Sequence, residues 1–130
     1  NSTLNNVMLT LKYAGFGKSE AIEKSKEVIN KVGLSDRLNH SPAELSGGQQ
    51  QRVAIARALV NNPSIIFADE PTGNLDSKTG KEVMTLFKEL NDTGQTIILI
   101  THEESVAKQS NRIITIKDGL IKSDNREAYE

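Results

Sequence analysis

The sequence predicts an α/β protein, in which a helical subdomain is followed by part of a parallel sheet. Two short apolar runs, at residues 64–68 and 96–100, have the length of strands buried on both faces. A helical pattern separates them, and strands that alternate with helices form parallel βαβ units. Residues 1–62 carry helical patterns only, so we expect them to form the helical subdomain and residues 63–130 to form the sheet-bearing part.

The first 62 residues predict helices that end at turn residues. In one helix, apolar residues recur at helical spacing up to Val32, with Ser19 as the expected N-cap and Gly33 as the residue that ends it. Residues 34–45 then form a connection. A second helix begins at residues 46–48, where a serine precedes two glycines.

In the remaining residues, strands and helices alternate. The first apolar run leads into Asp69 and Glu70, and a helix with one apolar stripe then closes at residues 92–94. The second run leads into His102 and a short helix. The Asp-Gly pair at residues 118–119, between two apolar segments, predicts a β-hairpin.

Composition limits the classes of function. The chain has 130 residues, 36% hydrophobic and 25% charged, which is typical of a globular protein. A net charge of −1 gives no electrostatic reason to expect nucleic acid as a partner. The absence of cysteine excludes disulfides and thiolate metal sites. No apolar run approaches the roughly 20 residues needed to span a bilayer, so we expect no direct membrane insertion.

The strongest chemical signal in the second half is at residues 65–70, where four apolar residues precede Asp-Glu. In an open parallel sheet, ligands bind beyond the carboxyl ends of the strands. Asp69 offers a carboxylate oxygen of the kind that Mg²⁺ prefers. Glu70 is placed to polarise a water for attack on a γ-phosphate. From these residues alone, two solvated acids at the end of a strand are an equal alternative.

Residues 45–49 (LSGGQ) supply a second signal. Gly47 and Gly48 leave backbone N–H groups unobstructed at a helix start, where the helix dipole favours an anion. Ser46 adds a hydroxyl donor. The alternative is an N-cap serine followed by a flexible turn.

Taken together, these segments resemble the ATPases of ABC transporters. Residues 45–49 are similar to the signature motif of that family, residues 65–70 to its Walker B motif, residues 73–76 to its D-loop and His102 to its H-loop histidine. Residues 68–77 resemble the subgroup that serves lipoprotein release, macrolide export and antimicrobial-peptide resistance. The resemblance implies the C-terminal part of a RecA-like P-loop NTPase with its helical signature subdomain.

The resemblance also implies roles for individual residues. Two ATPase domains would pair head to tail around two ATP molecules. Glu70 and His102 would be catalytic, His102 touching the γ-phosphate of ATP in its own subunit, and Asp69 would bind Mg²⁺. Asp76 would cross the dimer interface. Ser46, Gly48 and Gln49 would contact the γ-phosphate of ATP held by the opposite subunit. Gly47 and Asp76 would belong with them to the nucleotide-binding residues.

The partners implied by the resemblance are a second ATPase domain and transmembrane permease subunits. They would place the protein in the cytoplasm, peripheral to the inner face of the cell membrane.

The 130 residues contain no G-x-x-x-x-G-K-[ST] loop. Residues 17–19 (GKS) imitate its end, but Lys12 stands where the first glycine is required, so we expect a helix-start turn there.

Without that loop, we expect the chain to be a C-terminal portion of the ATPase and inactive alone. A second hypothesis is a non-catalytic folded module that only pairs or docks. A chromosome-maintenance or DNA-repair ATPase is disfavoured, because neither coiled-coil heptads nor a basic surface are evident. We expect His40 to be a surface residue.

Overall fold

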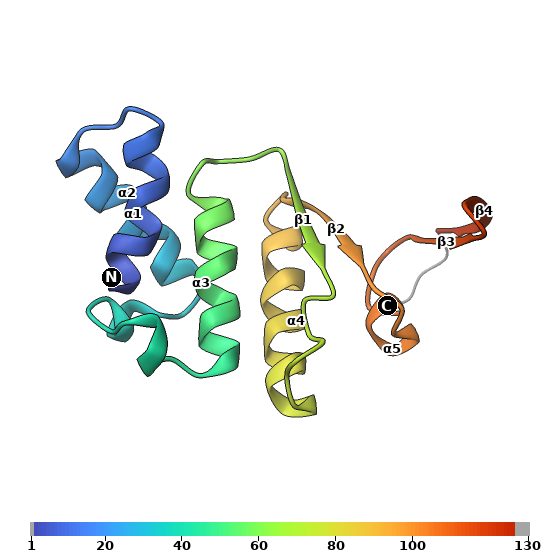
Figure 1. The fold of residues 1–130 in the computed structure, drawn as a ribbon. Coiled ribbons are helices and arrows are strands. Elements are labelled where there is room, and N and C mark those ends of the chain that lie inside the picture. The colour runs from blue at the N-terminus through green and yellow to red at the C-terminus, as the bar shows by residue number, and fades with distance from the viewer. Residues whose placement is uncertain (1, 127–130) are drawn as a thin grey trace.

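The computed structural model describes residues 2–126. The helices are α1 (Thr3–Tyr13), α2 (Lys18–Lys31), α3 (Gly47–Leu59), α4 (Ser77–Asp92) and α5 (Glu104–Ala107), with short 3-10 helices η1 (Ser35–Arg37) and η2 (Pro42–Glu44). The strands are β1 (Ile65–Asp69), β2 (Thr96–Ile100), β3 (Ile113–Lys117) and β4 (Leu120–Asn125). Figure 1 shows α1 and α2 on one side, then α3, α4, the β1–β2 sheet and finally the β3–β4 hairpin.

Helix α1 is an addition to the elements expected from the sequence. Its apolar residues Val7, Met8 and Leu11 share one face and are buried. The hydroxyl of Ser2 accepts the N–H of Asn5 at 3.1 Å and so caps the helix. Both the apolar spacing and the capping serine are visible in the sequence, so local signals could have predicted this helix.

Helix α2 begins two residues earlier than expected. Gly17, with extended backbone angles, is the N-cap, and the helix starts at Lys18. The predicted Ser19 cap is therefore wrong, because Ser19 already lies within the first turn. The expectation of a helix-start turn at residues 17–19 is confirmed. Gly33, at φ +76°, follows the end of the helix as predicted.

Strands β1 and β2 are parallel and in register from Ile65 opposite Thr96 to Asp69 opposite Ile100, as the βαβ prediction required. The prediction that the strands are buried on both faces is wrong. Ile66 and Ala68 are buried, whereas the alternating Phe67 is 68% exposed. Helix α4 lies along one face of the sheet, and no element of residues 2–126 covers the other (Figure 1).

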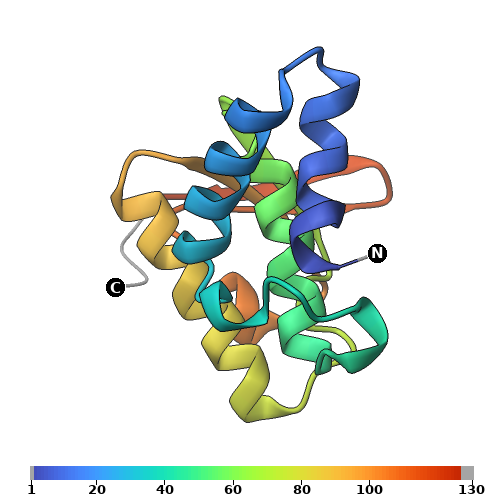
Figure 2. The ribbon, with the colours of Figure 1, turned by 90° about the vertical axis from the view of Figure 1, so that its left-hand side faces the viewer.

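One hydrophobic cluster joins the helices to the sheet. It includes Leu11 of α1, Ile29 of α2, Val53 of α3 and Phe87 of α4, and the half-buried Leu99 of β2 packs against it. Figure 2 shows α1, α2 and α3 side by side, with α4 next to them. This cluster includes residues from both sides of position 62, so it does not test the predicted subdomain boundary, which stays a prediction.

The β3–β4 hairpin forms a separate antiparallel sheet and confirms the Asp-Gly turn. Asp118 and Gly119 both have positive φ, 53° and 76°, as a two-residue hairpin turn requires. Across the open end, the Arg112 guanidinium donates to both carboxylate oxygens of Asp124 at 2.9 and 2.6 Å. Over residues 2–126, no helix has the length and apolar character needed to span a membrane.

Candidate functional site

The residues predicted to act in chemistry gather where the parallel strands end. Asp69 is the last residue of β1 and Glu70 follows it, while His102 lies two residues beyond the end of β2. The N–H of Glu70 donates to the Ile100 carbonyl at 2.7 Å, so backbone pairing continues past the strand. Glu70 has φ +46°, a left-handed backbone that is uncommon for a residue other than glycine.

Glu70 and His102 are in direct contact. The Oε1 atom of Glu70 lies 2.6 Å from Nδ1 of the His102 ring and accepts the His102 backbone N–H at 2.8 Å. An ionised carboxylate only accepts hydrogen bonds, so the ring proton in this contact lies on Nδ1. The His102 side chain is 88% exposed, which leaves the ring accessible to a ligand.

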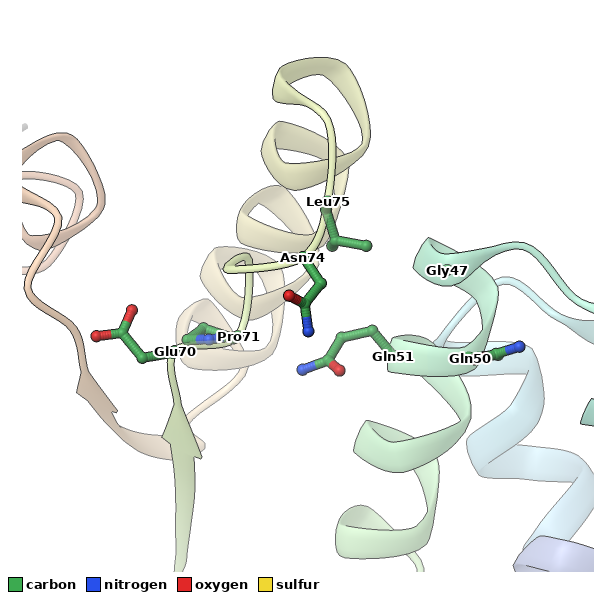
Figure 3. A pocket seen from close by; sticks show the side chains of 7 residues that line it. All are labelled: Gly47, Gln50, Gln51, Glu70, Pro71, Asn74 and Leu75. Carbon is green, nitrogen blue, oxygen red and sulfur yellow. The ribbon is translucent and has the colours of Figure 1, made fainter.

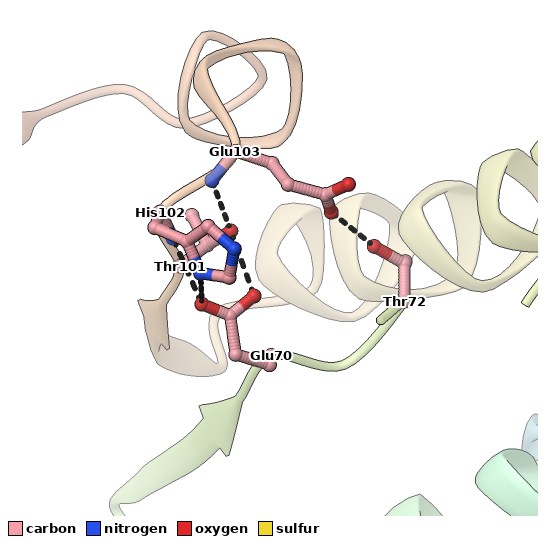
Figure 4. A network of polar contacts seen from close by, with 5 residues as sticks. All are labelled: Glu70, Thr72, Thr101, His102 and Glu103. Carbon is pink, nitrogen blue, oxygen red and sulfur yellow. Dashed lines mark hydrogen bonds and ion pairs between the residues drawn. The ribbon is translucent and has the colours of Figure 1, made fainter. Parts of the chain in front are cut away.

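A hydroxyl that sequence reasoning missed holds the second oxygen of Glu70. Thr101 donates from Oγ1 to Glu70 Oε2 at 3.2 Å and accepts the Glu103 N–H at 3.0 Å. The Glu103 carboxylate in turn accepts the Thr72 hydroxyl at 3.4 Å. These contacts connect the loop after β1 with the loop after β2 (Figure 4). Only the position of Thr101, between the second apolar run and His102, hinted at this role.

These contacts determine the charge state of Glu70. Loss of solvent alone would raise the pKa of its carboxyl group. The donors from the His102 backbone, the His102 ring and the Thr101 hydroxyl outweigh that effect and lower the pKa of Glu70 below its usual value. The carboxylate is therefore negatively charged at neutral pH.

The neighbouring carboxylate, Asp69, is available to a ligand. Asp69 is exposed at the end of β1, and its side chain has no hydrogen-bond or ion-pair partner among residues 2–126. That part of the chain also holds no group of three acidic, histidine or cysteine side chains that could bind a metal ion by itself. A single free carboxylate fits Mg²⁺, which protein sites usually hold through one or two carboxylates together with substrate phosphates and waters.

The helix start at the signature residues is capped by its own side chains. The Ser46 hydroxyl accepts the N–H of Gln49 at 3.1 Å, and the Gln49 side chain accepts the Ser46 N–H at 3.0 Å. This reciprocal pair is a capping box. Ser46 and Gly47 are exposed, so this turn is available to a ligand or partner.

Gly48 is buried in close contact with α4. A Cβ atom built on Gly48 would lie 2.4 Å from Cγ2 of Thr79, far inside an ordinary contact distance. Packing of α3 against the start of α4 therefore requires a residue without a side chain at this position. Sequence reasoning had explained the glycine only by access of an anion to the backbone.

A pocket of about 370 Å³ lies between the start of α3 and the loop after β1. Its lining residues are Gly47, Gln50, Gln51, Glu70, Pro71, Asn74 and Leu75. Figure 3 shows the Gln51 and Asn74 carboxamides facing each other across it, with Glu70 on the far side. Of the predicted site residues, Gly47 and Glu70 both line this pocket, whereas the other signature residues do not.

Two further predicted residues have structural contacts. Asp76 is the N-cap of α4, and its carboxylate accepts the Thr79 N–H at 3.3 Å. That hydrogen bond lowers the pKa of Asp76. His40 is half-buried rather than fully at the surface, and its carbonyl accepts the N–H of Thr3 at 2.8 Å. The proposed roles of the site residues toward nucleotide stay predictions.

Comparison with protein families gives a match to the model described as "ABC transporter" over residues 2–73. An uncharacterized ABC transporter ATP-binding protein of Methanocaldococcus jannaschii, MJ1508, is 56% identical over 120 residues, which are 92% of this chain and 54% of that protein. The macrolide export ATP-binding/permease protein MacB of Bdellovibrio bacteriovorus is 54% identical over 121 residues, which are 93% of this chain and 18% of that protein.

A solved structure supports the same relationship. It is the dimeric post-hydrolysis state of the ATP-binding cassette MJ0796 bound to ADP and Pi, with a TM-score of 0.77 and 45% identity over 96% of this chain and 56% of that chain. This chain thus spans about half the length of that cassette and of the ATP-binding protein from M. jannaschii, and a smaller share of MacB.

Proposed function

The chain belongs to the ABC transporter family, and on this premise we propose that it forms the signature and Walker B part of an ATPase that drives a membrane transporter. The full-length protein would hydrolyse ATP to ADP and phosphate. The observation that carries the proposal is the contact between Glu70 and His102 at the carboxyl end of the parallel strands, with a free carboxylate, Asp69, beside it.

Glu70 would act on the attacking water. Its carboxylate is charged at neutral pH, so it can accept a hydrogen bond from water and orient an oxygen lone pair toward the γ-phosphorus. Phosphoryl transfer depends mainly on positioning and electrostatics, so a weak base in the right place is sufficient. The proton released as the water attacks would pass to Glu70 and then to solvent.

His102 would hold the γ-phosphate. Its Nδ1–H is committed to Glu70, so contact with a phosphate oxygen falls to Nε2, which must carry a second proton to donate. The resulting imidazolium would lie between two anions. Asp69 would hold Mg²⁺ bound with the nucleotide, and that ion would neutralise phosphate charge.

The exposed turn at Ser46 would serve a second copy of the chain. Its capping box occupies the N–H of Gln49, and within residues 2–126 the N–H groups of the two glycines have no capping partner. An anion on a partner subunit would be stabilised at that helix end. Dimer formation in the related cassette MJ0796 supports such a pairing, and the relative MacB, an ATP-binding/permease protein, supports a transmembrane partner. With such a partner, the protein would lie at the inner face of the membrane.

Glu70→Gln in the full-length protein tests the proposed function. The amide keeps the shape of the side chain but cannot accept the proton, so ATP should still bind while the steady-state rate of hydrolysis falls by at least about 100-fold. A dimer that forms with ATP should then persist, as measured by size-exclusion chromatography.

Glu23→Gln, on an exposed part of α2, is the matched control and should leave turnover unchanged. Wild-type turnover in the Glu70→Gln protein would remove Glu70 from the role of base. Absence of ATP hydrolysis by the wild-type full-length protein would favour the non-catalytic module instead.

A further inference from the structure

Thr101 contacts Glu70 but belongs to neither the signature motif nor the Walker B motif. It directly follows β2, and its side chain is partly buried between the two loops at the end of the sheet (Figure 4). Its Oγ1 atom lies 3.2 Å from Glu70 Oε2 and 3.0 Å from the Glu103 nitrogen.

The direction of these hydrogen bonds follows from the chemistry of the groups. A threonine hydroxyl has one hydrogen to donate and lone pairs to accept with. The Glu103 N–H can only donate, and the Glu70 carboxylate can only accept. The Thr101 hydrogen is therefore directed at Glu70, and the Glu103 amide holds the hydroxyl in that orientation.

This contact restricts a motion that the His102 contacts leave open. Both donors from His102 reach the same atom, Oε1 of Glu70. The last torsion of a glutamate side chain is broad, so a carboxylate held at one oxygen can still pivot about that oxygen as the side-chain torsions adjust together. Thr101 holds the other oxygen, and contacts at both oxygens fix the plane of the carboxylate.

We propose that Thr101 is a positioning residue, which acts through Glu70 by fixing the plane of the carboxylate that orients the attacking water. The inference rests on the proposed ATPase function and adds a residue to that site. Loss of the hydroxyl would leave Glu70 attached to His102 but free to turn. Because ATP does not contact Thr101 in this account, nucleotide affinity should not change.

The test compares Thr101→Val with Thr101→Ser in the full-length protein. Valine keeps the shape of threonine without the hydroxyl, and serine keeps the hydroxyl. We expect Thr101→Val to lower kcat by about tenfold, the effect of losing one hydrogen bond to a charged group, with KM for ATP unchanged. Thr101→Ser should restore kcat to within about threefold of wild type. Thr85→Val, at an exposed hydroxyl of α4, is the control for the substitution itself.

A second measurement does not depend on turnover. The Glu103 amide loses its acceptor in Thr101→Val, so its hydrogen exchange, followed by NMR, should become faster, and Thr101→Ser should retain the wild-type rate. Binding of a fluorescent ATP analogue should be equal in all three proteins. Together, these readouts separate loss of the local hydrogen bond from loss of the fold.

Three results would overturn the inference: an unchanged kcat in Thr101→Val, an equal loss in Thr101→Ser, or a loss confined to KM. If the wild-type protein hydrolyses ATP, each of these results would contradict the role of Thr101 but not the proposed function. If the wild-type protein does not hydrolyse ATP, the proposed function fails and the role of Thr101 in turnover fails with it.

Discussion

The close approach of α3 and α4 at Gly48 yields a sharp prediction. In Gly48→Ala, the new methyl group would lie 2.4 Å from Thr79 Cγ2, whereas carbon atoms in good contact are about 3.5–4.0 Å apart. Relief of such an overlap by shifts in the packing costs about 1–3 kcal/mol. Alanine is the better helix former by up to about 1 kcal/mol, so we expect a net destabilisation of about 0–2 kcal/mol.

Thr79→Ser removes the clashing atom and so makes the prediction specific. The next nearest atom to the new methyl group is Thr79 Cβ at 3.9 Å, an ordinary contact. The double variant Gly48→Ala/Thr79→Ser should therefore be more stable than the sum of the single effects predicts, by about 1–2 kcal/mol. Urea unfolding followed by far-UV circular dichroism measures each free energy of unfolding.

Thr85→Ser, on the exposed side of the same helix, controls for the intrinsic effect of replacing threonine by serine. Effects that add to within about 0.5 kcal/mol would refute the packing explanation of Gly48. The double variant also separates two roles of this glycine. If stability returns but ATP-driven turnover does not, then Gly48 is needed for nucleotide contact as well as for packing.

The remaining predictions concern a partner contact, a buried hydroxyl and a surface ion pair. Ser46→Arg should block ATP-driven dimerisation by filling the exposed helix start; a normal dimer on size-exclusion chromatography would contradict the proposed contact. Ser25→Ala should stabilise the fold by about 1 kcal/mol in urea unfolding, because the Ser25 hydroxyl is fully buried and has no hydrogen-bond partner among residues 2–126; destabilisation would indicate a bound partner. The Arg112 guanidinium lowers the pKa of Asp124, so protection of hairpin amides from hydrogen exchange should be constant above the usual aspartate pKa of about 4 and fall as pH drops through the lowered value. Asp124→Asn should abolish that pH dependence, and its persistence would exclude this pair as the cause.

Local signals predicted most of the fold. The helix start at residues 46–48 and the Asp118–Gly119 turn depend on neighbouring residues, and the structure confirms both. Ser19 failed as a cap because a glycine two positions earlier adopts the capping conformation. The burial of β1 failed for a different reason: a short apolar run does not reveal whether elements cover one face or two, and Phe67 is exposed.

The sequence predicted where the site lies, at the carboxyl edge of the sheet, but not its side-chain contacts. Parallel strands end together, so proximity of Glu70 and His102 follows from topology alone. The contact of Thr101 with Glu70 does not, because it depends on the path of the loop after β2 and on the direction of a single side chain. The contact of Gly48 with Thr79 likewise depends on the distance between two helices, which no sequence spacing encodes.

Glu70 has a left-handed backbone conformation, which lowers stability at the residue on which turnover is proposed to depend. Glycine and asparagine adopt φ +46° more readily, and a glutamate there costs on the order of 1 kcal/mol. Hydrogen bonds of its N–H to Ile100 and of its carbonyl to Gly73 hold the main chain in this shape. Glycine at this position would relieve that strain only by removing the carboxylate, and with it the hydrogen bonds to His102 and Thr101 that connect the two loops.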